Sequence, residues 1–197
     1  IRELIVLFKI NHKIKILLTF FSPSGYEAFK NTNVADYVSY LPLDTKKNAI
    51  DFLNIVNPKF VIFSRSELWF NFINVAYIKN IPIFLVSVLL SAKSNFIKFP
   101  ARYFYKKSFK SFTKIYCQNQ LTKQLIFDTF KLKNTKLAGN TRIDRIVNTF
   151  NSKDFPQIEN FVNRDFCIIA GSTLKKDEQI VYDAIKKLDS YKLKWII

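Results

Sequence analysis

Residues 60–71 read FVIFSRSELWFN, and the fold class of the chain can be inferred from this stretch. Phe60–Phe63 is a continuous apolar run, which is typical of a strand covered on both faces. Polar residues end the run at Ser64–Ser66, and apolar residues then resume at helical spacing from Leu68. Glu67 lies at this junction, beyond the carboxyl end of the strand, and open α/β sheets bind their ligands at that edge.

The same alternation of strand and helix continues on both sides of this stretch. Such alternation predicts a parallel, doubly wound α/β sheet with helices between the strands. The helix after Asp44 carries apolar residues at helical spacing, and Asp44 is expected to be its cap. The predicted strands are Ile14–Phe20, Asp36–Asp44, Lys59–Phe63, Ile83–Val88, Lys114–Cys117 and Thr135–Ala138, and the later helices are Trp69–Lys79, Asn95–Ser111 and Leu121–Phe130.

The pattern changes near residue 148, which predicts two domains. We expect a Rossmann-like domain over residues 1–147, a polar linker over residues 148–164, and the start of a second Rossmann-like domain over residues 165–197. The chain opens inside an apparent helix and closes inside an apolar run. We therefore expect a fragment whose first domain lacks its first strand and whose second domain is truncated.

The composition limits the possible partners. Hydrophobic residues make up 49% of the chain, enough for a packed core, and the net charge is +16. Such a charge favours nucleic acid, an anionic membrane surface or a polyanionic substrate, although compositional drift toward lysine explains it equally well. No nucleic-acid-binding motif accompanies the charge, so no nucleic acid partner is predicted. No apolar run reaches the roughly 18 residues of a membrane span.

Cysteine and histidine offer little chemistry. Cys117 and Cys167 lie in or beside apolar runs and are expected to be buried free thiols in a reducing compartment. His12 is the only histidine and lies in a lysine-rich connector, so we expect neither a histidine-based triad nor a metal site. The glycines Gly25, Gly139 and Gly171 each follow a predicted strand, either as ligand-binding turns or as turns needed by the backbone alone.

Five segments, taken in order, resemble a known family. They are FFSPSGYE (20–27), YLPLD (40–44), SELWFN (66–71), AGNTRIDR (138–145) and AGSTLKKDE (170–178). This series resembles the transferases of 3-deoxy-D-manno-octulosonic acid (Kdo) in Gram-negative lipopolysaccharide synthesis.

The resemblance implies a GT-B glycosyltransferase with two Rossmann-like domains. Such an enzyme moves Kdo from CMP-Kdo to a hydroxyl of a lipid A precursor, without a metal or other cofactor, at the cytoplasmic face of the inner membrane. The family's general base precedes the first residue here, and its main CMP-binding segments would follow Ile197. We therefore expect this chain alone to be inactive. Alternatives are a GT-B transferase of another nucleotide sugar and a non-catalytic membrane- or lipid-binding module.

The resemblance also implies roles for particular residues. Glu67 matches a glutamate that stabilises the oxocarbenium-like transition state, although a structural cap on the following helix is the alternative. Arg142 stands where the family has lysine and would contact the departing phosphate or the Kdo carboxylate, the alternative being a surface arginine. The remaining candidates are cleft-lining residues for substrate: Ser22, Ser24, Gly25, Gly171, Ser172 and Thr173.

Residues 95–114 interleave aromatic rings with lysine and arginine. This combination suits an anionic bilayer surface, where the acceptor lipid of the family resides. A core helix with a solvated basic face explains the pattern equally well.

Overall fold

The computed structural model describes residues 5, 8–9, 14–65, 68–140, 143, 146–147, 155–188 and 193–196. Its chain divides into two compact units, Ile1–Val147 and Asn148–Ile197. Glu67 and Arg142 lie outside the described residues.

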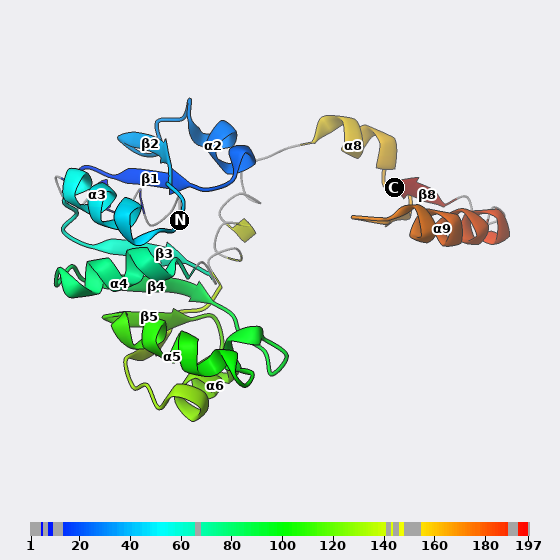
Figure 1. Ribbon diagram of the computed structural model, residues 1–197. Helices are drawn as coiled ribbons and strands as arrows, with labels where there is room; N and C mark the ends of the chain where they lie inside the picture. The colour runs from blue at the N-terminus through cyan, green and yellow to red at the C-terminus, as the bar shows by residue number, and fades with distance from the viewer. Residues whose placement is uncertain are drawn as a thin grey trace. The chain divides into compact units, whose positions relative to one another are not determined.

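The strands of the first unit are all paired in parallel, in two hydrogen-bonded groups of order β1-β2 and β3-β4-β5-β6. Across this unit, Figure 1 shows β2, β1, β3, β4 and β5 following one another. The predicted parallel α/β class is therefore confirmed. The strands are β1 (Leu17–Phe20), β2 (Tyr37–Tyr40), β3 (Val61–Ser64), β4 (Ile83–Val88), β5 (Lys114–Cys117) and β6 (Thr135–Leu137).

A helix follows each of the first five strands and returns the chain to the start of the next one. Parallel strands require such crossovers, and the carboxyl ends of hydrogen-bonded parallel strands then share one edge of the sheet. The described helices are α2 (Pro23–Phe29), α3 (Lys46–Val56), α4 (Phe70–Ile78), α5 (Ala101–Ser111) and α6 (Gln120–Phe130).

The core of the first unit lies where β4 and β5 pack against the helices. Ile83, Leu85 and Ile115 on these two strands are fully buried. Thr122 is also fully buried, and its hydroxyl accepts from the backbone N–H of Leu90 at 3.1 Å and donates to the Leu90 carbonyl at 3.3 Å. Since both groups of Leu90 are satisfied, this polar contact fixes the chain beyond β4 at little cost in desolvation.

The predicted helix Asn95–Ser111 is wrong as a single element. A short 3-10 turn occupies Asn95–Ile97, and α5 begins only at Ala101. Pro100 explains the break, because proline disfavours helical backbone in the residue before it and lacks an N–H of its own.

The predicted cap of α3 is also wrong by one residue. Thr45 is the N-cap, and its hydroxyl accepts from the backbone N–H of Asn48 at 3.2 Å. Asp44 instead lies at the start of a different helix, α4.

The second unit pairs β7 (Cys167–Ile169) with β8 (Lys194–Ile196) in parallel. Helix α8 (Pro156–Val162) precedes β7, and α9 (Lys175–Leu188) joins the two strands. Within the described part of both units, no helix is long and apolar enough to cross a membrane.

Candidate active site

Two of the five motif segments are locked together at the first turn of α4. The Asp44 carboxylate accepts the backbone N–H of Asn71 at 3.0 Å and that of Phe72 at 3.3 Å. In return, the side-chain amide of Asn71 donates to the Asp44 carbonyl at 2.7 Å. Asp44 thus caps α4 from a distant part of the sequence, and its negative charge also suits the positive end of the helix.

A third segment joins the same place through aromatic contacts. Phe21, just beyond β1, lies with its ring 4.8 Å from that of Trp69, just before α4. Tyr26 on α2 stacks on Tyr40 at the end of β2, with ring centroids 4.1 Å apart. The segments that follow β1, β2 and β3 therefore meet, as expected of a ligand-binding edge in an α/β fold.

The predicted residues of the α2 turn have identifiable structural roles. The Ser22 hydroxyl accepts from the backbone N–H of Gly25 at 3.3 Å and lies 3.3 Å from the Ser24 hydroxyl. A Cβ atom on Gly25 would lie 2.6 Å from the Phe20 ring, so any other residue here would require that ring to move. Both serines are exposed, so their hydroxyls face solvent at the edge where the segments meet.

Left-handed backbone conformations occur at or near the ends of several strands, and the sequence did not predict them. Arg65, directly after β3, has φ 61°. Ser87, the second-last residue of β4, has φ 57°. Ser172 beyond β7 has φ 61°. Such conformations are unfavourable for residues other than glycine and cluster at functional sites. Neither arginine nor serine signals this geometry in the sequence.

The fourth segment follows β6. The backbone N–H of Ala138 donates to the Cys117 carbonyl at 2.9 Å, and this bond extends the β5–β6 pairing. Gly139 then turns with φ 73°, a conformation that glycine adopts freely. The turn carries the chain toward the predicted Arg142, which lies outside the described residues.

The fifth segment belongs to the second unit and opens α9. Leu174 donates its backbone N–H to the Asp177 carboxylate at 3.0 Å, and the Thr173 hydroxyl lies 3.4 Å from a Glu178 oxygen. The helix therefore supplies its own acidic groups to its first turn. A Cβ atom on Gly171 would meet nothing within 4 Å, so packing does not require glycine there.

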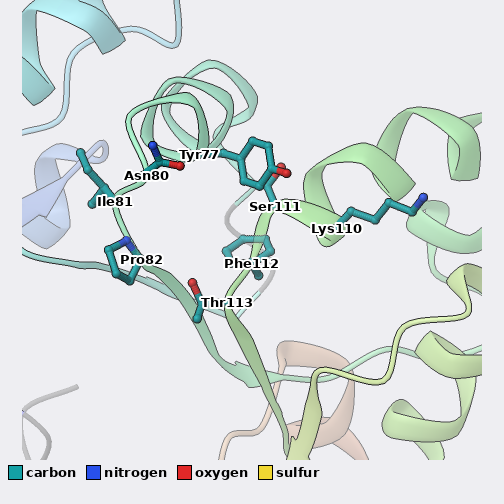
Figure 2. Close-up of a pocket in the computed structure, with 8 residues that line it drawn as sticks. All are labelled: Tyr77, Asn80, Ile81, Pro82, Lys110, Ser111, Phe112 and Thr113. Atoms are coloured by element: carbon teal, nitrogen blue, oxygen red, sulfur yellow. The ribbon is translucent and has the colours of Figure 1, made fainter.

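A surface pocket of about 250 Å³ lies elsewhere in the first unit. It is lined by the ends of α4 and α5 and by the residues that lead into β4 and β5, which places it at the amino end of these strands. Figure 2 shows Lys110 extending away from the other lining residues. None of the predicted site residues lines it. Its lining residues are Tyr77, Asn80, Ile81, Pro82, Lys110, Ser111, Phe112 and Thr113.

The two cysteines differ in how deeply they are buried. Cys117 is a buried free thiol, as predicted, and burial raises its pKa to about 11. A thiol with such a pKa stays protonated at neutral pH and is a poor nucleophile. Cys167 is a free thiol that is only partly buried. Among the described residues, no three histidine, cysteine, aspartate or glutamate side chains cluster closely enough to hold a metal ion.

The chain is similar to a known protein family and to known proteins. Residues 1–145 match the family described as 3-Deoxy-D-manno-octulosonic-acid transferase (kdotransferase). The chain is 26% identical over 184 residues to a bifunctional glycosyltransferase/methyltransferase of Fusobacterium nucleatum, and the matched region covers 90% of this chain and 29% of that protein. It is 39% identical over 84 residues to a 3-deoxy-D-manno-octulosonic acid transferase of Haemophilus influenzae, and the matched region covers 41% of this chain and 19% of that protein. The chain thus spans less than a third of either relative's length.

Solved structures show a similar fold. A putative UDP-N-acetylglucosamine 2-epimerase from Listeria monocytogenes matches with a TM-score of 0.65 and 12% identity, covering 98% of this chain and 57% of that one. The UDP-N-acetylglucosamine 2-epimerase of Rickettsia bellii matches with a TM-score of 0.56 and 14% identity, covering 97% and 56%. At these identities the likeness concerns the fold alone, and it confirms a Rossmann-like, GT-B-like architecture.

Proposed function

The chain belongs to the 3-deoxy-D-manno-octulosonic-acid transferase (kdotransferase) family, and from this premise we propose that it transfers Kdo from CMP-Kdo to a lipid A precursor. The first unit would form the acceptor side of the site, and the second unit would begin the domain that binds the nucleotide sugar. We place the reaction at the cytoplasmic face of the inner membrane, where the acceptor lipid is available.

The observation that carries this proposal is the meeting of three motif segments around the first turn of α4. The segment that holds Glu67 leads directly into this turn, whose position is fixed by Asp44 and by the Phe21–Trp69 contact. Preorganised catalysis requires that the backbone leading from a catalytic group is held in place. A carboxylate held there would stabilise positive charge on the anomeric carbon as the bond to CMP breaks.

The structure of the α4 cap bears on the alternative role of Glu67. A capping carboxylate accepts hydrogen bonds from the backbone N–H groups of the second and third helical residues. In α4 these residues are Asn71 and Phe72, and both groups already donate to Asp44. This favours a role for Glu67 in catalysis over a role as the cap of α4.

The other predicted residues complete the proposed site. Arg142 would neutralise the departing phosphate or the Kdo carboxylate through its positive charge. Ser22 and Ser24 would offer exposed hydroxyls to the acceptor, next to the turn that Gly25 permits. Gly171, Ser172 and Thr173 would line the donor side, where the absence of a Cβ atom at Gly171 leaves the backbone open to close approach.

A transfer assay with the full-length gene product tests the proposal. Labelled CMP-Kdo and a lipid A precursor are incubated with the protein, and we expect label to appear in the lipid. A parallel panel of other nucleotide sugars tests the donor. Transfer from another donor in preference to CMP-Kdo would overturn the proposed substrate, and lipid binding without transfer from any donor would favour the non-catalytic module.

A further inference from the structure

The middle of the first unit is exclusively basic. From Leu68 to Phe127 the sequence contains nine lysine or arginine residues and neither aspartate nor glutamate. The ion pairs found among the described residues all lie outside this stretch. Lys98, Arg102 and Lys107 are exposed at the surface. Their positive charges have no acidic neighbours in this stretch of the sequence. A surface of this kind attracts anions over distances of about a Debye length.

Exposed aromatic rings lie among these charges. Phe99, Tyr103 and Phe104 are 74%, 60% and 55% exposed. Phe99 and Tyr103 meet edge to face with centroids 5.9 Å apart, and the Arg102 guanidinium lies 6.0 Å from the first ring and 5.2 Å from the second. Farther along the same helix, Phe109 is 1% exposed and belongs to the core. The surface around the start of α5 is thus both basic and aromatic, and a surface exposed only to water does not require aromatic rings.

This surface adjoins the proposed transfer site. Helix α5 begins beyond the carboxyl end of β4, so its first turns lie at that end of the strand. Phe104 stacks on Phe70 with ring centroids 4.5 Å apart, and Phe70 is the first residue of α4. The exposed rings are therefore connected to the segment that follows Glu67. Lys110, by contrast, lies at the far end of α5, beside the pocket of Figure 2.

We propose that the start of α5 docks on an anionic lipid bilayer, with its rings in the interface and its cations on the headgroups. The docking surface, here called the α5 patch, consists of Lys98, Phe99, Arg102, Tyr103, Phe104 and Lys107. Aromatic rings favour the boundary between headgroups and acyl chains, and lysine and arginine bind anionic headgroups. The inference rests on the proposed function in one respect: a lipid acceptor would reach the start of α4 most directly from a bilayer held at this patch.

Vesicle binding by the full-length gene product tests the patch. Binding is measured by co-sedimentation with vesicles of phosphatidylcholine alone and of phosphatidylcholine mixed with phosphatidylglycerol. We expect the Lys98→Gln, Arg102→Gln, Lys107→Gln variant to bind the anionic vesicles at least about tenfold more weakly at low salt, since each cation near such a surface contributes favourably. The double variant Phe99→Ser, Tyr103→Ser should also weaken the binding that persists at high salt. Salt screens charges but does not screen the burial of aromatic rings.

The matched control removes the same charge elsewhere. Lys59, Lys110 and Lys133 are exposed, and each precedes or ends an element at the amino end of the strands. The control variant with glutamine at these three positions should bind vesicles like the wild type. Equal losses of vesicle binding in the two triple variants would show that only net charge matters and would overturn the proposal. Unchanged vesicle binding by the patch variant would also overturn it. Preference of the patch for single-stranded RNA over anionic vesicles would also overturn it.

The result can be separated from the proposed activity. With a water-soluble acceptor analogue, the patch variants should transfer Kdo at the wild-type rate, because the patch contacts the bilayer and not the reacting atoms. If the wild type transfers Kdo but its vesicle binding does not depend on the patch, the docking inference alone is wrong. If patch-dependent binding is found without any transfer, the docking inference holds and the proposed function fails.

Discussion

Asp44 shows how one side chain can link two sequence motifs. Its carboxylate caps α4, while the Asn71 amide returns a hydrogen bond to its backbone carbonyl. The sequence indicated a capping residue at this position but assigned it to α3, because a local cap is the usual case and the partner of Asp44 is remote in sequence. The contact explains why a YLPLD-like segment and an ELW-N-like segment occur together: each positions the other.

Removal of this cap should affect both stability and catalysis. We expect Asp44→Ala to lower the free energy of unfolding by about 1–2 kcal/mol, from the lost capping hydrogen bonds and the lost charge at the helix end. The same change should reduce kcat for Kdo transfer, because α4 begins directly beyond the Glu67 segment. Thermal unfolding and steady-state kinetics measure the two effects.

Thr45→Ala is the matched control for this prediction. It removes the N-cap of α3, with a similar expected cost of about 1 kcal/mol, but leaves the start of α4 intact. We therefore expect it to preserve kcat far better than Asp44→Ala does. Equal kcat values for the two variants would mean that the cap of α4 contributes only stability.

Arg142 can be tested through charge and geometry separately. Lysine keeps the positive charge but loses the bidentate fork, whereas alanine loses both. If the contact strengthens as CMP departs, Arg142→Lys should retain far more kcat than Arg142→Ala. Equal activity of the two variants, both folded by thermal melting, would make Arg142 an ordinary surface arginine.

At the scale of elements, the pairing of β1 with β2 depends on a reciprocal contact at its start. The Asp36 carboxylate accepts the backbone N–H of Ile16 at 2.7 Å, and the backbone N–H of Asp36 donates to the Ile16 carbonyl at 3.0 Å. The hydrogen bond from Ile16, followed by the charge of Lys9 at 3.7 Å, lowers the pKa of Asp36 below its ordinary value of 3.8. The ionised carboxylate is thus the form that the fold stabilises.

This pKa shift predicts a pH-dependent contribution to stability. Because the folded-state pKa is depressed, the stabilisation is fully present above pH 3.8 and is lost as the pH falls through the lower folded-state value. We expect Asp36→Asn to lower Tm at pH 7 and the difference from wild type to shrink at acidic pH. Asp51→Asn, at an exposed aspartate on α3, is the control. A difference in Tm that stays constant down to the acid limit would contradict the assignment.

The sequence predicted elements better than it predicted their connections. Strands β4 and β5 were predicted with their observed ends: Pro82 precedes β4, and the polar residues Thr113 and Gln118 flank β5. The break between Ile97 and Ala101 was missed, since helical spacing of aromatics and lysines outweighed the effect of Pro100. The contacts that join the motif segments depend on tertiary packing, so no local pattern could reveal them.

At the scale of the whole molecule, the motif segments of the first unit and its described pocket lie at opposite ends of the strands. The segments that follow β1, β2 and β3 meet through Asp44 and Trp69, whereas the pocket lies where β4 and β5 begin. Ligands of open α/β sheets bind at the carboxyl ends of strands. The proposed chemistry therefore belongs to the carboxyl ends of the strands, and the α5 patch would bring the acceptor lipid to the same end.

The most direct test of this central claim is kcat for Kdo transfer by the Glu67→Gln variant of the full-length gene product, relative to wild type. Glutamine keeps the size and a hydrogen-bonding oxygen but removes the charge. We predict that kcat falls on the order of a hundredfold while the affinity for CMP-Kdo changes little, since the carboxylate acts mainly on the charge of the transition state. A kcat close to the wild-type value would show that the charge of Glu67 takes no part in the chemistry.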